Sequence, residues 1–203
     1  MYVPAKFTLA EEAAWDVVLE AGAGTLVVAG ADGLASVFVP VVVSDDRRTL
    51  STHVARANPW WRVAEDDAEV LAIFVAASAY VSPSYYPSRL EDPRVVPTWN
   101  YVAAEVRGRV HVHDDADWTA IQVRRQTERF EASRSPQWRV DEAPEAYVSL
   151  QLKAIVGISI DVTSITGKAK LSQNRPALDH DSVREHLSGG GYADRNVADR
   201  MLE

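Results

Sequence analysis

Three strand-like segments follow one another between residues 24 and 55, with only tight turns between them. The stretch "GTLVVAGADGLASVFVPVVV" consists of two apolar runs around Asp32-Gly33, a dipeptide typical of β-hairpin turns. The turn "DDRR" comes next, followed by a third strand, "TLSTHVA", at residues 49–55. Parallel strands need a long crossover connection, usually through a helix, and these turns are too short for one. The sequence therefore favours an antiparallel sheet over a doubly wound parallel sheet.

Longer strands are predicted further along the chain. Residues 69–82, "EVLAIFVAASAYVS", are almost continuously apolar, which predicts a strand buried on both faces. Residues 99–113 and 155–167 alternate between apolar and polar side chains, whereas the prolines in residues 83–97 indicate an ordered loop. Six or seven strands joined mostly by hairpins indicate a closed or half-open antiparallel barrel with flanking helices, a mainly β fold of the α+β class.

Helices are predicted between and after these strands. Residues 8–22 form an amphipathic pattern in which Thr8 is the N-cap, Glu11 completes a capping box and Gly22 ends the helix. Asn58 can cap a short helix whose first position is a proline. Further helices are expected after a cap at Asp114 or Asp115, after Pro144, and on both sides of "LSGGGY" in the charged tail.

Composition narrows the classes of function. The 203 residues include no cysteine, which removes disulfides, thiolate metal sites and cysteine nucleophiles and fits a cytoplasmic protein. The net charge is -8 and the arginines are dispersed among acids, which disfavours direct DNA binding, because DNA-binding proteins present a basic surface to the phosphates. No apolar run is long enough to predict a membrane helix, and the N-terminus has no secretory signal pattern.

Common catalytic motifs are missing from the sequence, and the metal-like clusters have simpler explanations. The chain contains no G-x-S-x-G elbow, Walker loop or G-x-G-x-x-G motif, which argues against hydrolase, P-loop and Rossmann functions. His111 and His113 share one face of a strand and precede Asp114 and Asp115, so they could bind a metal. We favour an exposed strand end that leads into a helix cap, and we interpret "DHD" at residues 179–181 in the same way.

A polar cluster lies where the third strand meets a predicted helix start. The segment "STHVARANPWW" places His53, Arg56 and Asn58 there. Free backbone N–H groups and the helix dipole favour a phosphate at such a position, and an arginine adds a charge-assisted contact. An ordinary helix cap beside a surface arginine is the alternative.

Other polar clusters follow or open the long strands. The hydroxyl of Ser82, in "AYVSPSYYP", could hold a ligand or close a proline turn. The segment "VPTWNY" opens a strand with a hydroxyl, an indole, an amide and a phenol, which suit either a planar polar ligand or a crowded turn. "KAKLSQNRP" places Lys170, Ser172, Gln173 and Asn174 together. Such amides beside basic groups can read the edge of a heteroaromatic ring and neutralise a phosphate, or form a solvated loop.

Taken together, "MYVPAKF", "STHVARANPWW", "AYVSPSYY", "VPTWNYVAAEVRGRV" and "IVGISIDVTSITGKAKLSQNRP" resemble the PaiB family of FMN-binding negative transcriptional regulators. The motifs occur in the order typical of the family, and "PTWNY" and "KLSQNR" are the most specific. The resemblance implies a split β-barrel of the flavin-reductase and pyridoxamine-phosphate-oxidase type. It also implies a homodimer with FMN at the subunit interface. We expect residues 1–176 to form the FMN-binding domain and the helical tail, residues 177–203, to be part of it.

The resemblance also implies the residues that contact the cofactor. Those near the flavin would come from "PTWNY", those that hold the phosphate and ribityl chain from "HVARANP", and the "KLSQN" segment would approach from the partner subunit. The implied set is His53, Arg56, Asn58, Ser82, Thr98, Trp99, Asn100, Lys170, Ser172, Gln173 and Asn174. The chain departs from the family at Trp60, where a polar residue is usual, and in "SRLEDPR", which looks like an insertion. Because of these two differences, the resemblance does not define the residues at the outer rim of the site.

Three functions are compatible with these patterns. The first is an FMN-binding regulator that acts negatively on expression, either directly or without binding DNA itself. The second is an FMN-dependent NAD(P)H oxidoreductase such as a flavin reductase, and the third is a barrel that has lost its cofactor and works through protein contacts. We favour the first, and no residue stands out as a proton donor or acceptor for a substrate.

Overall fold

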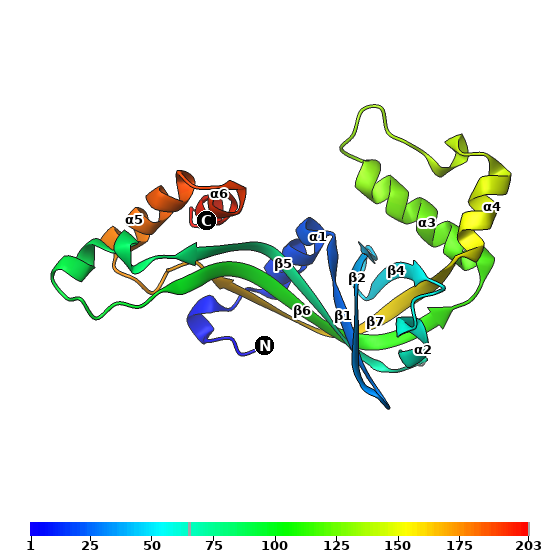
Figure 1. Cartoon of the computed structure of the whole chain (residues 1–203), viewed down its shortest axis with the longest axis horizontal. Helices are drawn as coiled ribbons and strands as arrows, with labels where there is room; N and C mark the ends of the chain where they lie inside the picture. The colour runs from blue at the N-terminus through cyan, green and yellow to red at the C-terminus, as the bar shows by residue number, and fades with distance from the viewer. Residues whose placement is uncertain (65, 203) are drawn as a thin grey trace. The chain divides into compact units, whose positions relative to one another are not determined.

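The computed structural model describes residues 1–64 and 66–202, and within these ranges one seven-stranded sheet is flanked by helices (Figure 1). The strands lie in the order β2-β1-β5-β6-β7-β4-β3. Their bounds are β1 Ala23–Gly30, β2 Gly33–Pro40, β3 Val42–Val43, β4 Thr49–Ala55, β5 Glu69–Val81, β6 Thr98–His113 and β7 Ile155–Lys170. The β1–β2, β1–β5, β3–β4 and β4–β7 ladders are antiparallel, which confirms the prediction made from the tight turns.

The helices lie where the sequence predicts them. They are α1 Glu11–Ala21, α2 Trp60–Val63, α3 Ala116–Glu131, α4 Glu145–Lys153, α5 Ala177–Ser188 and α6 Tyr192–Arg200, with short 3-10 helices η1 Ala5–Phe7, η2 Pro83–Tyr85, η3 Pro87–Leu90 and η4 Val140–Glu142. Asp115 is the N-cap of α3, because its carboxylate accepts the Trp118 N–H at 2.7 Å. Asn58 accepts the Trp60 N–H at 3.0 Å, but the N-cap of α2 is Pro59, so this helix begins one residue later than predicted. In the described part of the chain, no helix is both long and apolar enough to cross a membrane.

The start of α1 differs from the prediction. Thr8 is not its N-cap, because this residue forms an antiparallel bridge with Lys168 of β7. The next amide, of Leu9, donates to the Gly167 carbonyl at 3.2 Å. Pairing with β7 therefore keeps this segment extended and overrides the local capping-box pattern, and α1 begins three residues later. Gly22, with φ of +63°, follows the last helical residue as predicted.

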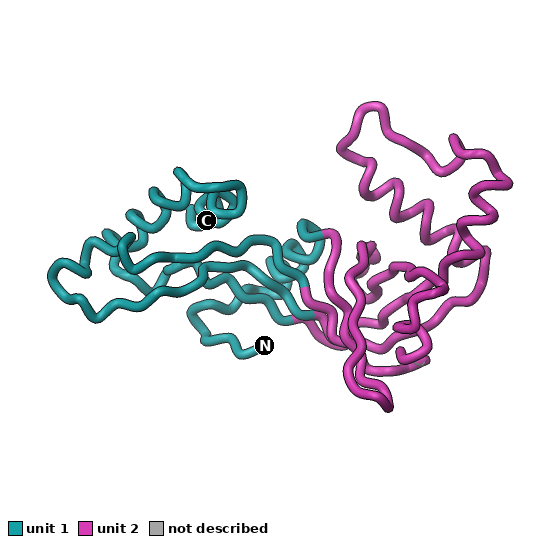
Figure 2. The backbone as a smooth tube through the Cα atoms, in the orientation of Figure 1, with its two compact units in different colours: residues 1–21, 74–105, 166–203 teal, residues 22–73, 106–165 magenta. Residues whose placement is uncertain are grey.

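The described part of the chain divides into two compact units, which Figure 2 shows in different colours. Unit 1 contains Met1–Ala21, Phe74–Glu105 and the chain from Thr166 onward, and unit 2 contains Gly22–Ile73 and Val106–Ile165. The long strands β5, β6 and β7 each contribute residues to both units. The predicted tail belongs to unit 1, together with strand residues of the predicted barrel domain.

The core of unit 2 lies on the inner face of its strands. Leu26 and Val28 of β1 are almost fully buried, as are Leu50 of β4 and Ile158 of β7. The cross-strand register pairs Leu26 with Val37 and Val28 with Ala35 on the neighbouring strand β2, so these side chains share the inner face. Alternation along the hairpin produces this burial, since every second side chain points to the same side.

The opposite side of the same hairpin is apolar and exposed. Thr25 pairs with Phe38 on one neighbouring strand and with Ile73 on the other, and Ala29 pairs with Leu34. Phe38 and Leu34 are 71% and 80% exposed. We call the surface formed by Val27, Leu34, Phe38, Leu71 and Ile73 the outer hairpin face.

Burial along β5 changes phase between Phe74 and Ala77. Up to this point the strand buries Phe74 and the residues two and four positions before it, and beyond it the strand buries Ala77 and the residues two and four positions after it. Residues three apart in an alternating strand point to opposite faces, so the buried face of β5 changes within this segment. The prediction that this strand is buried on both faces is therefore wrong for the chain by itself, because Val75 and Tyr80 are 54% and 47% exposed.

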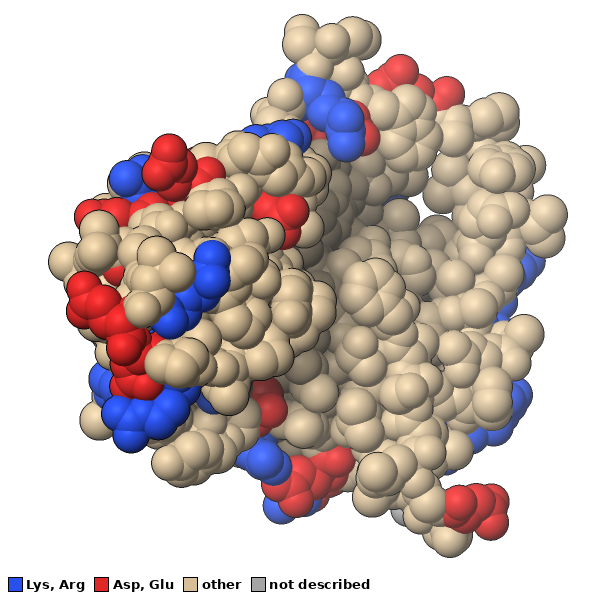
Figure 3. Space-filling model, turned by 60° about the vertical axis from the view of Figure 1, so that its left-hand side comes forward, with Lys and Arg blue, Asp and Glu red and all other residues tan. Residues whose placement is uncertain are grey.

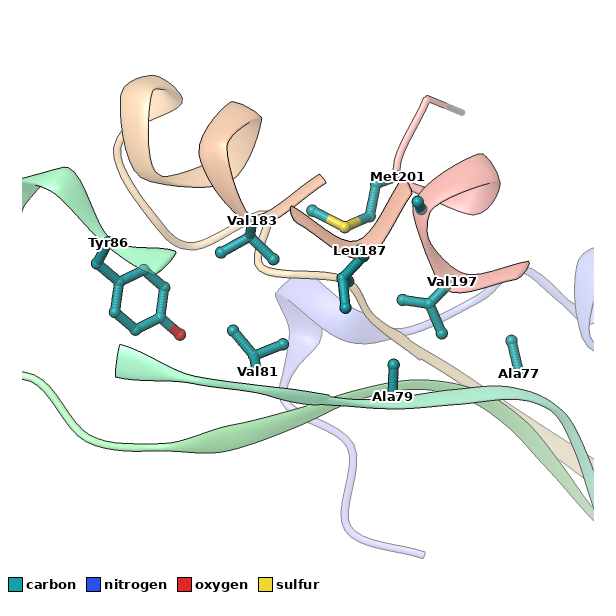
Figure 4. Close-up of a cluster of buried hydrophobic side chains, with 9 residues drawn as sticks. Ala77, Ala79, Val81, Tyr86, Val183, Leu187, Val197 and Met201 are labelled. Carbon is teal, nitrogen blue, oxygen red and sulfur yellow. The ribbon is translucent and has the colours of Figure 1, made fainter. Parts of the chain in front are cut away.

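In unit 1, helices α5 and α6 cover one face of β5 (Figure 4). Val183 and Leu187 of α5 and Val197 of α6 point toward the alanine and valine side chains of the strand. The buried carboxylate of Asp179, in the first turn of α5, accepts the N–H of Ser88 at 3.0 Å and its hydroxyl at 2.7 Å. The tail helices are thus part of the hydrophobic core of unit 1.

Candidate functional site

Lys170, the last residue of β7, connects two of the predicted polar clusters in unit 1. Its ammonium group donates to the Thr98 hydroxyl and, at 2.6 Å, to the Trp99 carbonyl, both at the start of β6. Burial, and then repulsion by Lys168 and Arg175, lowers the pKa of Lys170. A partly desolvated cation with two like charges nearby attracts an anion or a hydrogen-bond acceptor.

Aromatic side chains lie close to these cations. The half-exposed ring of Trp99 meets Tyr80 edge-on, with centroids 6.1 Å apart and an interplanar angle of 69°. The Lys168 ammonium lies 5.2 Å from the centroid of the Tyr101 ring. Since residues two apart on a strand share a face, the Trp99 and Tyr101 rings point to the same side of β6. Exposed rings beside cations provide a stacking surface for a planar, negatively charged ligand.

Asn100 faces the opposite side of β6, in the interior. It is 0% exposed, and its amide nitrogen donates to the Ser172 hydroxyl at 3.0 Å. That hydroxyl in turn donates to the Asn100 carbonyl oxygen at 3.1 Å, and the amide nitrogen lies 3.7 Å from the sulfur of Met201. Ser172 has φ of +64°, so this buried pair holds a strained turn directly after β7. Asn100 and Ser172 therefore fix the position of Lys170 and Trp99, and their own polar atoms face each other.

The other residues predicted in unit 1 have mostly local partners. Gln173 accepts the Leu171 N–H at 2.6 Å and donates to the Ala169 carbonyl at 2.6 Å, so its amide closes the turn. Ser82 is the N-cap of η2, where its hydroxyl accepts the Ser84 N–H at 3.2 Å, the proline-turn role considered above. Asn174 is exposed at the surface of the same turn as Gln173.

Arg56, Asn58 and His53 lie in unit 2, at the end of β4 and the start of α2. The Arg56 guanidinium donates to the Lys153 carbonyl at 2.9 Å and to the Ile155 carbonyl at 3.1 Å. It also forms an ion pair with Asp114, whose carboxylate oxygen lies 2.6 Å from Nη2. The hydrogen bond to this carboxylate raises the pKa of Arg56 and lowers the pKa of Asp114. Two backbone carbonyls thus hold the Arg56 guanidinium in place, and its Nη2 group also contacts the Asp114 carboxylate, which another anion could replace.

His53 lies on the face of β4 that α3 contacts. Its partner across the ladder to β7 is Gly157, and the Trp118 ring of α3 lies 2.3 Å from where a Cβ at Gly157 would be. The Nδ1 atom of His53 is buried and has no hydrogen-bond partner among the described residues. Burial lowers the pKa of this imidazole below 6.5, so the ring is neutral at pH 7.

The two histidines at the end of β6 have separate protein partners. His111 lies between Asp66 and Asp161, with nitrogen-to-oxygen distances of 3.4 and 3.2 Å. His113 contacts the Ser159 hydroxyl at 2.8 Å and stacks on Trp118. Within residues 1–64 and 66–202, no group of three or more histidine, aspartate or glutamate side chains is arranged to hold a metal ion.

The structure thus brings the predicted residues together in two groups, each within one unit. Thr98, Trp99, Asn100, Lys170 and Ser172 form the first, and His53, Arg56 and Asn58 form the second. The predicted set omits neighbours that complete these groups: Lys168, Tyr101 and Tyr80 in the first and Asp114 in the second. Strand alternation would have found Tyr101 and Lys168, which share a face with Trp99 and Lys170.

Charge on the surface agrees with the dispersed basic residues of the sequence. Toward the left of Figure 3, lysine and arginine side chains lie directly beside aspartate and glutamate side chains. Such pairing weakens the long-range attraction of phosphates that a DNA-binding surface needs.

Comparisons with known proteins give a family, a relative and structural neighbours. Residues 1–164 match the family described as "Putative FMN-binding domain". "Protease synthase and sporulation protein PAI 2" of Bacillus subtilis is 34% identical over 191 residues, which cover 92% of this chain and 89% of that protein.

Two solved structures resemble the fold at low sequence identity. The FAD- and heme-binding protein from Mycobacterium smegmatis has a TM-score of 0.60 and 16% identity, covering 91% of this chain and 80% of that one. The flavocytochrome Anf3 from Azotobacter vinelandii has a TM-score of 0.58 and 9% identity, covering 83% of this chain and 72% of that one. Together with the antiparallel sheet, this likeness confirms the split β-barrel fold.

Proposed function

Because this chain belongs to the FMN-binding domain family that matches its residues 1–164, we propose that it is an FMN-binding homodimer that regulates transcription negatively. The family confirms FMN as the predicted cofactor. The contact residues, the dimer and the regulatory role are the proposal, as is the cytoplasmic location. The proposed FMN-binding domain consists of residues 1–176, and the helical tail, residues 177–203, is part of it.

The observation that carries the proposal is the cluster around Lys170. A lysine that donates to Thr98 and to the Trp99 carbonyl lies beside further cations and exposed aromatic rings. This donor set fits FMN, which combines a planar heteroaromatic ring with an anionic phosphate. In the proposed dimer, this cluster approaches the cofactor that the partner subunit holds.

Arg56 is the proposed phosphate contact in unit 2. Its guanidinium is fixed by two backbone carbonyls, and an arginine held in this way is preorganised to bind a phosphate. The buried, unpartnered Nδ1 of His53 lies three residues before it, and we assign this atom and Asn58 to the ribityl chain and phosphate.

Bound FMN would supply hydride-transfer chemistry. The protein's own contribution is electrostatic: the positive charge of Lys170 would favour a reduced, anionic flavin over an oxidised, neutral one. The pKa of Lys170 is lowered from 10.5, so its positive charge is lost at a lower pH than that of an exposed lysine as pH rises.

The outer hairpin face supports the proposed homodimer. Phe38 and Leu34 are largely exposed there beside Ile73 and Val27, and contiguous apolar surface of this kind marks an association site. A mainly apolar face can pack against a second copy of itself, as a twofold interface between identical chains requires.

The regulatory role is supported by the relative in Bacillus subtilis, which is named a protease synthase and sporulation protein. The net charge of -8 and the interleaved surface charges favour action through another protein over direct DNA binding. A gel-shift at physiological salt checks this, and a stable complex with duplex DNA would contradict it.

The first experiment is the visible absorption spectrum of the purified protein, before and after FMN is added and the excess removed. Retained flavin near one per subunit is the expected result. Lys170→Met and Arg56→Gln should each weaken FMN binding about tenfold or more, the loss typical of a charge-assisted contact. Arg134→Gln, which removes an exposed positive charge outside both groups of site residues, is the matched control. Unchanged affinity in both site variants would refute the site.

The dimer is tested by the molar mass in solution, against a subunit mass of 22.3 kDa. Phe38→Glu should convert a dimer to monomers, since it places a charge in the apolar face. Leu178→Glu introduces the same charge at an exposed leucine of α5 and should leave the dimer intact.

The alternative function, an FMN-dependent flavin reductase, is tested by enzyme assay. Consumption of NADPH or NADH that depends on added FMN would favour this function over the regulatory role.

A further inference from the structure

Helix α3 is fastened at both ends by aromatic side chains that lie on glycines. At its start, Trp118 covers Gly157 and stacks on His113, with centroids 3.9 Å apart and planes 6° from parallel. At its end, the Phe130 ring lies 2.9 Å from where a Cβ at Gly22 would be. Both contacts depend on the missing side chain of the glycine, which lets a ring approach the backbone.

Between these ends, the underside of α3 is polar and poorly satisfied. The fully buried residues of α3, which is described throughout, are Thr119 and Gln122. Gln122 Nε2 and Gln126 Oε1 have no hydrogen-bond partner in the described chain, and His53 Nδ1 on the facing strand has none either. A buried polar group without a partner costs about 1–3 kcal/mol. The docked position of α3 therefore depends on the contacts at its ends.

The Arg56–Asp114 ion pair is part of the fastening at the start of α3. Asp114 directly precedes the N-cap, Asp115, and its carboxylate lies 2.6 Å from the Arg56 guanidinium. Because carbonyls of Lys153 and Ile155 fix Arg56, the ion pair holds the first turn of α3 to this end of the sheet. The same guanidinium is the group that an incoming phosphate would contact.

We propose that the phosphate of bound FMN displaces Asp114 from Arg56, and that the first half of α3 loosens as a result. This inference rests on the proposed function, in which Arg56 binds the phosphate. A phosphate monoester carries about -1.5 to -2 charges near pH 7 and offers several acceptor oxygens, so it competes well with a single carboxylate. Once Asp114 is released, water can reach the amides of Gln122 and Gln126. The mobility of α3 then depends on flavin occupancy.

Hydrogen–deuterium exchange of the full chain tests the link. Exchange in peptides from residues 116–124 should become faster with FMN and stay unchanged with riboflavin, which lacks the phosphate. Peptides from α5 serve as an internal reference, because that helix belongs to unit 1.

The variant that isolates the ion pair is Asp114→Asn. Since it removes the competitor for Arg56, FMN affinity should rise about two- to fivefold, the range for an exposed ion pair, and riboflavin affinity should not change. Exchange in α3 of the flavin-free variant should match that of the FMN-loaded wild type. Asp117→Asn removes the same charge from the first turn of α3 and is the matched control: FMN affinity should stay unchanged, and its α3 exchange shows the effect of the lost helix-dipole interaction alone.

Three results would overturn the inference, and they can be told apart. Lower FMN affinity in Asp114→Asn would mean that Asp114 positions Arg56 for the phosphate. If FMN binding requires Arg56 but leaves hydrogen exchange in α3 unchanged, phosphate binding does not loosen α3, and the proposed function is unaffected. FMN affinity equal to wild type in Arg56→Gln would refute both the phosphate contact and the displacement of Asp114.

Discussion

Replacing Asn100 by alanine should destabilise the protein, whereas replacing its neighbour Trp99 should mainly weaken flavin binding. The two residues are adjacent in "PTWNY", yet Asn100 is 0% exposed and Trp99 is 54% exposed. The sequence-based hypothesis places both near the cofactor. Their different burial predicts that single substitutions separate a positioning residue from a ligand contact.

The size of the effect follows from the contacts of Asn100. Its amide exchanges hydrogen bonds of 3.0 and 3.1 Å with Ser172. Each bond contributes about 0.5–1.5 kcal/mol net, and a buried hydroxyl left unpaired costs about 1–3 kcal/mol. Asn100→Ala should therefore lower the free energy of unfolding by about 2–4 kcal/mol. Trp99→Ala loses an edge contact with Tyr80, worth about 0.5–1.5 kcal/mol.

Urea titration followed by circular dichroism measures the free energy of unfolding, and flavin fluorescence measures FMN affinity in the same preparations. Ser172→Ala and the double variant complete a cycle, and the double variant should cost about 1–2 kcal/mol less than the sum of the single ones. If Asn100→Ala unfolds like the wild type but loses FMN tenfold or more, Asn100 is a direct ligand contact and the structural reasoning is refuted.

Other substitutions test the packing of each unit and its response to pH. Leu187→Ala should lower the free energy of unfolding by about 2–5 kcal/mol, because the side chain is buried between α5 and β5; an unchanged urea midpoint would show that the tail is not part of the core. Gly157→Ala should cost about 1–3 kcal/mol and shift the fluorescence of Trp118, since the new methyl group would lie 2.3 Å from that ring; an unchanged spectrum would contradict the stack. Burial lowers the pKa of His53 below 6.5, so the folded state binds fewer protons than the unfolded one; the resulting stability is complete above pH 6.5 and is lost as pH falls toward the folded pKa. His53→Asn should flatten this decline in pH-dependent urea titrations, and an equally steep decline would assign it to other groups.

Local patterns in the sequence predicted most of the fold. The Asp32-Gly33 hairpin, the strand at residues 49–55 and the cap at Asp115 each depend on neighbouring residues alone, and the structure confirms them. Thr8 failed as a helix cap because it pairs with Lys168, which is 160 residues away in the chain. A capping-box pattern contains no information about such a partner.

In the candidate site, too, contacts between residues far apart in the chain could not be predicted from local patterns. The grouping of Lys170 with Thr98 and Trp99 was implied by the family resemblance and lies outside what spacing alone can give. Asp114 was interpreted as a cap or metal ligand, because its ion pair with Arg56 joins residues 58 positions apart. Burial of Asn100 also depends on a distant residue, Ser172, so the sequence could not separate it from Trp99.

The phase change in β5 limits how this chain can vary in evolution. Deleting one residue between Phe74 and Ala77 would make each residue after the deletion point to the opposite side of the strand. Tyr80 would turn toward α5 and α6, and Ala79 and Val81 would turn to the surface. An insertion or deletion in the "DDRR" turn leaves every core contact in register, whereas one in β5 exchanges the inside and outside of half a strand. Among homologues, the length of β5 should thus be invariant even where its residues are not.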